Sequence, residues 1–246
     1  MQDLQQEKKS KVYFASDFHL GVPNRNQSLE KEKRIVRWLE SIEQDAKELY
    51  LLGDIFDFWF EYKYVVPKGF VRFLGKLAQM SDCGCTIHYF CGNHDIWQKD
   101  YLEKELGFIV HRDYHKVTID GKIFLLGHGD GLDSSDKKYK LLNRIFKNRF
   151  CISAFASLHP RWAFSIGRKS HSESDRISLG TEEPIYKYCQ NKLKTEDIDF
   201  FIFGHRHIEC DMALNEKSRY INTGFWEIKS PYAEWDGKNL MLKNFE

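Results

Sequence analysis

Aspartate, histidine and asparagine recur in five short polar clusters of this chain, and together they offer the donor atoms of a metal site. The clusters are Asp17 with His19, Gly53-Asp54 with Asp57, the run 92–95 (Gly-Asn-His-Asp), Gly127-His128, and the run 204–207 (Gly-His-Arg-His). Carboxylate and amide oxygens combined with imidazole nitrogens suit Mn²⁺, Fe²⁺ or Zn²⁺. A site of this kind requires no cysteine ligand.

The candidate ligands outnumber those that one ion requires. They are Asp17, His19, Asp54, Asn93, His128, His205 and His207. Two ions ~3.5 to 4 Å apart that share one carboxylate would use all of them, with Asp54 as the natural bridging ligand. Such a pair generates a water nucleophile at neutral pH and stabilises the charge on the entering and leaving oxygens at phosphorus. The pattern therefore predicts hydrolysis of a phosphoester or a phosphoanhydride.

Apolar, strand-like runs precede the clusters and must position them. The runs are residues 12–15, 49–52, 87–90, 123–126 and 200–203. Because the buried strands of an open α/β sheet end along one edge, where ligands usually bind, residues far apart in the sequence should converge there. Each cluster alone is more typical of loop chemistry or a structural histidine, but the ordered set indicates a metal centre.

The rest of the chain alternates helical and strand-like patterns. Amphipathic helices are predicted for residues 28–47, with Ser28 as the cap, and for residues 70–80. Asp120-Gly121 and Asp236-Gly237 each lie between β-rich runs and predict hairpins. The sheet should therefore contain antiparallel as well as parallel strands.

The five clusters, in this order, resemble the signature of the calcineurin-like metallophosphoesterases, and the resemblance spans residues 17–207. It implies a four-layer α/β/β/α sandwich with a dinuclear centre at the sheet edge. It also implies two ligand sets: Asp17, His19, Asp54 and His207 for one ion, and Asp54, Asn93, His128 and His205 for the other. His94 would be a catalytic histidine that binds no metal, supported by Asp57.

Further runs are similar to one branch of this family, whose members cleave the diphosphate of UDP-2,3-diacylglucosamine in lipid A biosynthesis. The runs are 17–21, 53–59 and 128–139. Asp57 is followed by Phe58 and not by the arginine typical of protein phosphatases, which argues against that class. Members of this branch commonly carry arginine at the position of His94, so a broad-specificity phosphodiesterase or nucleotide phosphatase stays the alternative. A non-catalytic interaction module is disfavoured because every ligand position is intact.

The same resemblance implies the cofactors and the contacts with a lipid-linked UDP sugar. Mn²⁺ is the expected metal, with Fe²⁺ or Zn²⁺ as alternatives, and no nucleic-acid partner is expected. The expected substrate-binding residues are Asn93, His94, Asp136, Arg168, Ser170 and His205.

Positive charge gathers in one segment of a chain whose formal net charge is only +1. Residues 133–171 hold nine basic and two acidic side chains, which leaves the rest of the chain at −6. Aromatic and aliphatic residues recur there near helical spacing, so the segment is both basic and amphipathic. We expect a helical cap over about residues 133–185 that faces an anionic membrane surface or ligand. A solvated helical insertion is the simpler alternative.

Composition predicts one domain over residues 1–246, since 42% of them are hydrophobic and can form a substantial core. No apolar run approaches the ~20 residues of a membrane span, and the polar amino terminus lacks a signal-like core, so we expect a cytoplasmic protein peripheral to the inner face of the membrane.

The six cysteines are expected to be free thiols. Histidines without placement at a strand end are expected in the core or on the surface: His88, His111, His115, His159 and His171.

Overall fold

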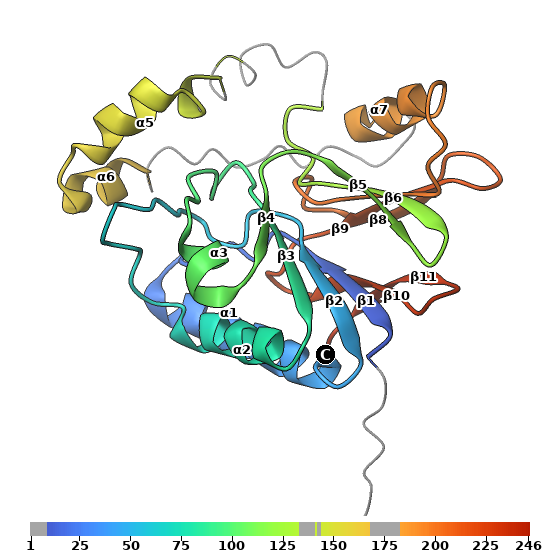
Figure 1. Cartoon of the computed structure of the whole chain (residues 1–246), viewed down its shortest axis with the longest axis horizontal. Helices are drawn as coiled ribbons and strands as arrows, with labels where there is room; N and C mark the ends of the chain where they lie inside the picture. The colour runs from blue at the N-terminus through green and yellow to red at the C-terminus, as the bar shows by residue number, and fades with distance from the viewer. Residues whose placement is uncertain (1–8, 133–140, 142–143, 168–182) are drawn as a thin grey trace, which may run out of the picture.

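Two mixed β-sheets lie face to face at the centre of the molecule, which a computed structural model describes over residues 9–132, 141, 144–167 and 183–246 (Figure 1). Within these residues the first sheet has six strands in the order β11-β10-β1-β2-β3-β4. Their bounds are β1 Lys11–Ala15, β2 Ala46–Leu51, β3 Thr86–Phe90, β4 Ile109–His111, β10 Pro231–Trp235 and β11 Leu240–Asn244. Strands β1 to β4 are parallel, and β10 pairs antiparallel with both β1 and β11.

The second sheet, counted over the same described part of the chain, has five strands in the order β5-β6-β7-β9-β8. Their bounds are β5 His115–Ile119, β6 Lys122–Leu126, β7 Phe200–Phe203, β8 Glu209–Ala213 and β9 Arg219–Thr223. Strands β6, β7 and β9 are parallel, whereas β5 and β8 run antiparallel at the two edges. Asp120-Gly121 joins β5 to β6 as the predicted hairpin, and residues 236–239 join β10 to β11 in the same way.

Side chains that alternate along each strand divide the apolar residues between the layers. Phe14 of β1 faces the second sheet and stacks on Phe124 of β6, with 5.9 Å between ring centroids. Its neighbour Tyr13 faces the opposite way, toward helices α1 (Arg25–Ile42) and α2 (Val71–Asp82). Helix α7 (Pro184–Lys192) covers the outer face of the second sheet. The order helix, sheet, sheet, helix confirms the predicted four-layer α/β/β/α sandwich.

The first helix differs from its predicted bounds at both ends. Helix α1 begins at Arg25 because the side chain of Asn24 caps it, accepting hydrogen bonds from two amides of the first turn. The predicted cap, Ser28, lies inside the helix and instead accepts a hydrogen bond from the Gly21 amide at 2.8 Å. At the other end, Lys47 belongs to strand β2 and not to the helix. Helix α2 lies close to its predicted bounds.

Two helices of the predicted cap, α5 (Arg149–Ala156) and α6 (Pro160–Gly167), lie beyond the end of the sheets, near the loops that follow β2 and β3 (Figure 1). Phe155 of α5 packs against Phe60, and Phe164 of α6 packs against Phe58, with ring centroids 4.9 Å and 5.1 Å apart. These aromatic contacts fix the two helices to the body of the molecule. Helix α3 (Tyr101–Leu106) connects β3 to β4. Among the described residues, no helix combines the length and the apolar character needed to cross a membrane.

Candidate metal centre

The polar clusters meet at one edge of the sandwich because the parallel strands that precede them end there. Asp17 and His19 follow β1, Asp54 follows β2, and His205 and His207 follow β7. Asn93 and His94 follow β3, and His128 follows β6. The convergence expected from the sequence is therefore present in the structure.

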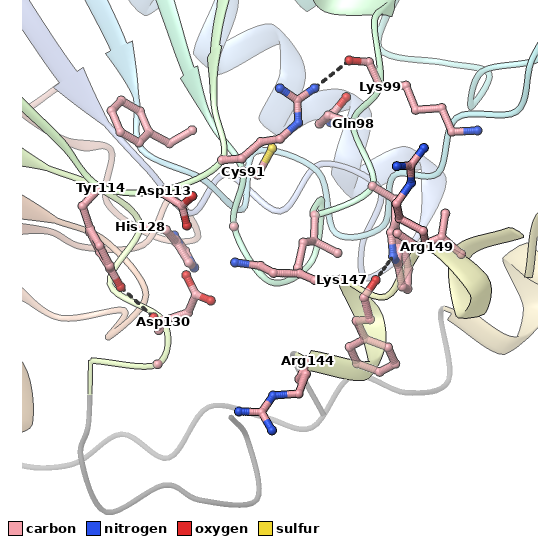
Figure 2. A pocket seen from close by; sticks show the side chains of 18 of the residues that line it. Cys91, Gln98, Lys99, Asp113, Tyr114, His128, Asp130, Arg144, Lys147 and Arg149 are labelled. Carbon is pink, nitrogen blue, oxygen red and sulfur yellow. Dashed lines mark hydrogen bonds between the residues drawn. The ribbon is translucent and has the colours of Figure 1, made fainter. Parts of the chain in front are cut away.

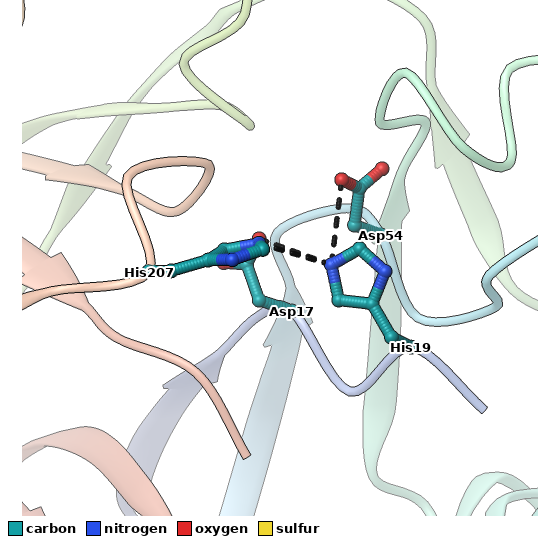
Figure 3. A group of neighbouring side chains, drawn as sticks. All are labelled: Asp17, His19, Asp54 and His207. Carbon is teal, nitrogen blue, oxygen red and sulfur yellow. Dashed lines mark hydrogen bonds and ion pairs between the residues drawn. The ribbon is translucent and has the colours of Figure 1, made fainter. Parts of the chain in front are cut away.

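One group of side chains that could hold a metal ion consists of Asp17, His19, Asp54 and His207 (Figure 3). His207 Nε2 lies 3.3 Å from Asp17 Oδ1 and 3.1 Å from His19 Nε2. His19 Nε2 lies 3.7 Å from Asp54 Oδ2. Two carboxylates and two imidazoles from three strand ends thus point at a common position.

A second group consists of Asp54, His128 and His205. His128 Nε2 lies 3.1 Å from Asp54 Oδ2 and 3.2 Å from Asn93 Oδ1. The other ring nitrogen of His128, Nδ1, donates to the backbone oxygen of Leu52 at 2.9 Å, which directs Nε2 toward the centre, where it could serve as a ligand once it gives up its proton to an incoming ion. Among the described residues, Asp54 alone belongs to both this group and the preceding one, as a bridging ligand must.

His94 and Asp57 form a third arrangement beside these two groups. His94 Nδ1 lies 3.0 Å from the backbone oxygen of Asp57 and 3.5 Å from its Oδ1. His94 Nε2 faces the centre, 3.9 Å from Asp54 Oδ2. Asp57 Oδ1 also lies 3.5 Å from His19 Nδ1, so one carboxylate orients two imidazoles.

The backbone that carries the candidate ligands adopts an unusual conformation. Five of them have left-handed φ angles: Asp17 at 53°, His19 at 43°, Asp54 at 52°, His205 at 70° and His207 at 55°. Non-glycine residues rarely adopt such angles, and those that do concentrate at functional sites. Backbone hydrogen bonds from the amides of Asp17 and His19 to the strand-end loop of β2 hold the first turn in place.

Two glycines of the motifs let the loops approach the carboxylates closely. A Cβ at Gly92 would collide with the side chain of Asp54, and a Cβ at Gly204 would collide with that of Asp17. The buried side chain of Asp95 ties the loops together, since it accepts hydrogen bonds from the amides of Gly92 and Ile55 at 2.7 Å and 2.9 Å. The loops are thus shaped before any ligand binds.

Electrostatics prepares the carboxylates to bind cations. Burial alone would raise the pKa of Asp54, but the charges of His128 and His94 hold it well below its usual value. Burial likewise opposes the charged form of His19, yet hydrogen bonding to Asp17 and Asp57 raises its pKa to about 9. Asp54 is therefore ionised at neutral pH, and the protonated imidazoles around it supply positive charge that bound cations would replace. The donor set and its charge fit two divalent ions.

A cavity of about 850 Å³ opens beside His128 and extends beneath the cap (Figure 2). Arg112, Arg144 and Lys147 line it, together with apolar side chains such as Trp97 and Phe146. Trp97 Nε1 donates to the backbone oxygen of Phe146 at 3.0 Å, which fixes the cap against the loop that follows β3. The cavity is therefore cationic and aromatic at once.

A second cavity, of about 1000 Å³, reaches Asp57 and Gly21. Its walls are mainly apolar, with Phe58, Phe70 and Phe164 among them. Two sizeable spaces thus adjoin the candidate centre.

The predicted substrate-binding residues fall into two sets. Asn93, His94 and His205 lie at the centre described above. Asp136, Arg168 and Ser170 lie outside the described residues, as do residues 133–140 and 168–182 of the predicted cap.

Sequence reasoning missed two supports of the centre. Arg206, between the two histidines that follow β7, forms an ion pair with the buried carboxylate of Glu183, with 3.0 Å between Nε and Oε1. Glu183 also caps helix α7, so this pair fastens the histidine loop to the sandwich. Phe225 stacks on His207. Arg206 lies within the run 204–207, but neither Glu183 nor Phe225 belongs to a motif, and no sequence signal marks them.

The histidines predicted to lie apart from the centre form a feature of their own. His88, His111 and His115 line up between β3, β4 and β5, where the two sheets meet at one edge. His159 is exposed on the cap, and His171 lies outside the described residues. All six cysteines are free thiols, as predicted.

Comparison with known proteins agrees with this geometry. The profile of the family described as calcineurin-like phosphoesterase matches residues 10–209. A UDP-2,3-diacylglucosamine hydrolase of Porphyromonas gingivalis is 42% identical to this chain, covering 97% of it and 98% of the relative. A protein of the same name from Haemophilus influenzae is 28% identical, covering 87% of this chain and 90% of the relative. Another from Ectopseudomonas mendocina is 26% identical, covering 96% of this chain and 98% of the relative. The matched residues include the whole strand-end centre, and the chain belongs to the calcineurin-like phosphoesterase family.

Proposed function

We propose that this protein hydrolyses the diphosphate of UDP-2,3-diacylglucosamine, giving UMP and 2,3-diacylglucosamine 1-phosphate, a step of lipid A biosynthesis. The observation that carries the proposal is a centre with two ligand groups sharing Asp54, set between two cavities of about 850 and 1000 Å³. A diphosphate with a bulky group on each side requires space of this kind. Relatives similar over nearly the full chain carry the matching name.

The two ions would be held by the ligand sets that share Asp54: Asp17, His19, Asp54 and His207 for one, and Asp54, Asn93, His128 and His205 for the other. When bound, two divalent ions supply a water nucleophile at neutral pH and neutralise charge on the phosphate oxygens. We assign Mn²⁺ to these sites, because oxygen and imidazole donors without thiolate suit it; Fe²⁺ and Zn²⁺ are the alternatives.

His94 is assigned the proton that the leaving phosphate needs. Its Nδ1 faces the backbone oxygen of Asp57 and therefore carries one proton. Its Nε2 faces the centre. Burial opposes a second proton, but the charge of Asp54 and the hydrogen bond to Asp57 raise the pKa of His94. As water bonds to one phosphorus and the bond from that phosphorus to the bridging oxygen breaks, Nε2 can donate its proton to the leaving oxygen. Asp57 holds the ring in this orientation.

The exposed side chains of the cap support a lipid-linked substrate that the enzyme reaches at a membrane surface. Arg144, Lys147 and Arg161 are exposed on it, as are two aromatic side chains, Phe150 at 86% and Trp162 at 64% exposure. Exposed aromatic and cationic side chains together favour an anionic lipid surface. We therefore assign residues 133–185 as a helical cap inserted in a single domain, peripheral to the cytoplasmic face of the membrane.

Turnover of UDP-2,3-diacylglucosamine beside soluble phosphodiesters and nucleotides, with metal analysis of the same sample, tests the proposal. The lipid-linked substrate should give a much higher kcat/KM than any soluble ester, with about two equivalents of metal bound. The Asp54→Asn variant serves as the background control for contaminating hydrolases. Equal turnover of soluble diesters would favour the broad-specificity phosphodiesterase, and absence of hydrolysis of every substrate would refute both.

A further inference from the structure

Phe225 is a half-buried aromatic residue beside the centre that belongs to none of the motifs. Its ring lies nearly parallel to the imidazole of His207, with centroids 4.6 Å apart and 14° between the planes. The same ring meets His19 edge-on, at 5.4 Å and 85°. One aromatic side chain thus contacts both histidines of the first ligand group.

Helix α1 contacts Phe225 and the backbone that follows it. The ammonium of Lys31, on the buried face of the helix, lies 5.2 Å from the centroid of the Phe225 ring. Arg34, one turn further along, donates hydrogen bonds to the backbone oxygens of Trp226 and Glu227 at 3.0 Å and 2.9 Å. Lys31 and Arg34 of α1 therefore anchor the segment that carries Phe225.

The next residue fixes the segment to the core. Trp226 is fully buried and packs against Phe18 and Trp38, with ring centroids 4.8 Å and 5.1 Å apart. The backbone at Phe225 is consequently held by Arg34 and by the buried Trp226, and its ring forms a flat wall against the imidazole of His207.

We propose that Lys31 and Phe225 are positioning residues that set the affinity of the ligand group containing His19 and His207 for its ion. This inference rests on the proposed function only in treating these two histidines as ligands. A flat aromatic neighbour restricts rotation of the His207 ring, which keeps Nε2 directed at Asp17 and at His19 Nε2. Lys31 draws the ring toward α1 through its attraction to the negative face of the aromatic system. Residues that orient metal ligands typically contribute ~10 to 100-fold to affinity.

Calorimetric titration of the metal-free full chain with Mn²⁺ tests the proposal, because it resolves the two binding events without measuring turnover. Phe225→Leu, which keeps apolar volume but loses the flat ring, should weaken one event about tenfold, or about 1.4 kcal/mol, and leave the other unchanged. Phe225→Tyr keeps the ring and should bind as wild type. Lys31→Met should weaken the same event by about two- to fivefold. Its matched control is Lys33→Met, which removes an exposed lysine of the same helix that is paired with Glu30 and should change nothing.

Two outcomes separate this inference from the site assignment. If Phe225→Leu and Lys31→Met bind both ions as wild type while His207→Ala loses one, the positioning role is wrong and the ligand set stands. If His207→Ala keeps both ions, the ligand set itself is wrong. Circular dichroism melts of each metal-free variant show whether it folds, and should Phe225→Leu fail to fold, Lys31→Met against Lys33→Met decides the question.

Discussion

Acidification should destabilise this protein through two histidines that belong to none of the catalytic motifs. His88 Nδ1 and His111 Nε2 are 3.0 Å apart, so one nitrogen donates and the other accepts while both rings are neutral. Burial lowers the pKa of each to about 4; the charge of His115 adds to this, whereas Glu48 opposes it at His88. Protonation of both rings would set two N–H groups against each other and break the hydrogen bond.

The direction and size of the effect follow from proton binding. In the unfolded chain both histidines titrate near pH ~6.5. Between about pH 6.5 and pH 4 the unfolded state therefore binds more protons than the folded state, so the free energy of unfolding falls as pH falls. At ~1.36 kcal/mol per pH unit and ring, a dry interior would give about 7 kcal/mol. Because water reaches the His111 side of the pair, we expect about 3 kcal/mol, equivalent to about 6 to 12 °C in Tm for a chain of this size.

Urea unfolding of metal-free protein at pH 6.5, 5.5 and 4.5 measures this effect. The double variant His88→Gln with His111→Gln can still hydrogen-bond but cannot titrate, so its stability should fall less steeply than that of the wild type. The His159→Gln variant replaces an exposed cap histidine and should follow the wild type. Parallel curves for the wild type and the double variant between pH 6.5 and 4.5 would refute the reasoning.

Three further predictions concern the proposed chemistry. Asp54→Asn should lower kcat at least ~10³-fold while the circular dichroism spectrum stays native, since one change weakens both ligand groups; near-wild-type turnover at saturating Mn²⁺ would contradict the shared ligand. His94→Ala should keep its metal content in elemental analysis but lose ~10² to 10⁴-fold in kcat, and a metal-free preparation would show that His94 is a ligand. The third change neutralises five cap cations: Lys137, Lys138, Lys140, Arg144 and Lys147. Sedimentation with anionic vesicles should show weaker binding, and raised salt should mimic the change, because each cation near the surface contributes about 1 kcal/mol and its effect fades within a Debye length. Unchanged vesicle binding at low salt would leave the cap as a solvated insertion.

The strand ends and the residues at them could be predicted from the sequence because local signals were strong. Apolar runs such as 200–203 end directly in polar residues, and a parallel sheet must gather those ends at one edge. The two Asp-Gly hairpins were equally local, since glycine favours the positive φ that such turns need. The four-layer order followed from the resemblance that these motifs carry.

Features that depend on contacts between distant segments could not be predicted. The start of α1 was misplaced because Asn24 and Ser28 are both good caps, and only the tertiary contact between Ser28 and the Gly21 amide decides between them. The pair of Arg206 and Glu183 joins residues on different elements without a spacing rule. Phe225 looks like an ordinary core residue in the sequence, and its role depends on which ring it faces.

The left-handed backbone at five candidate ligands has an evolutionary consequence. Each such non-glycine residue costs on the order of 1 kcal/mol, a cost that selection tolerates only while catalysis is needed. At His19 and His207, replacement by glycine would relax the backbone and remove a ligand in one step. A descendant freed from catalytic duty could therefore gain stability by losing its chemistry, and the sandwich would survive as a scaffold available for binding other molecules.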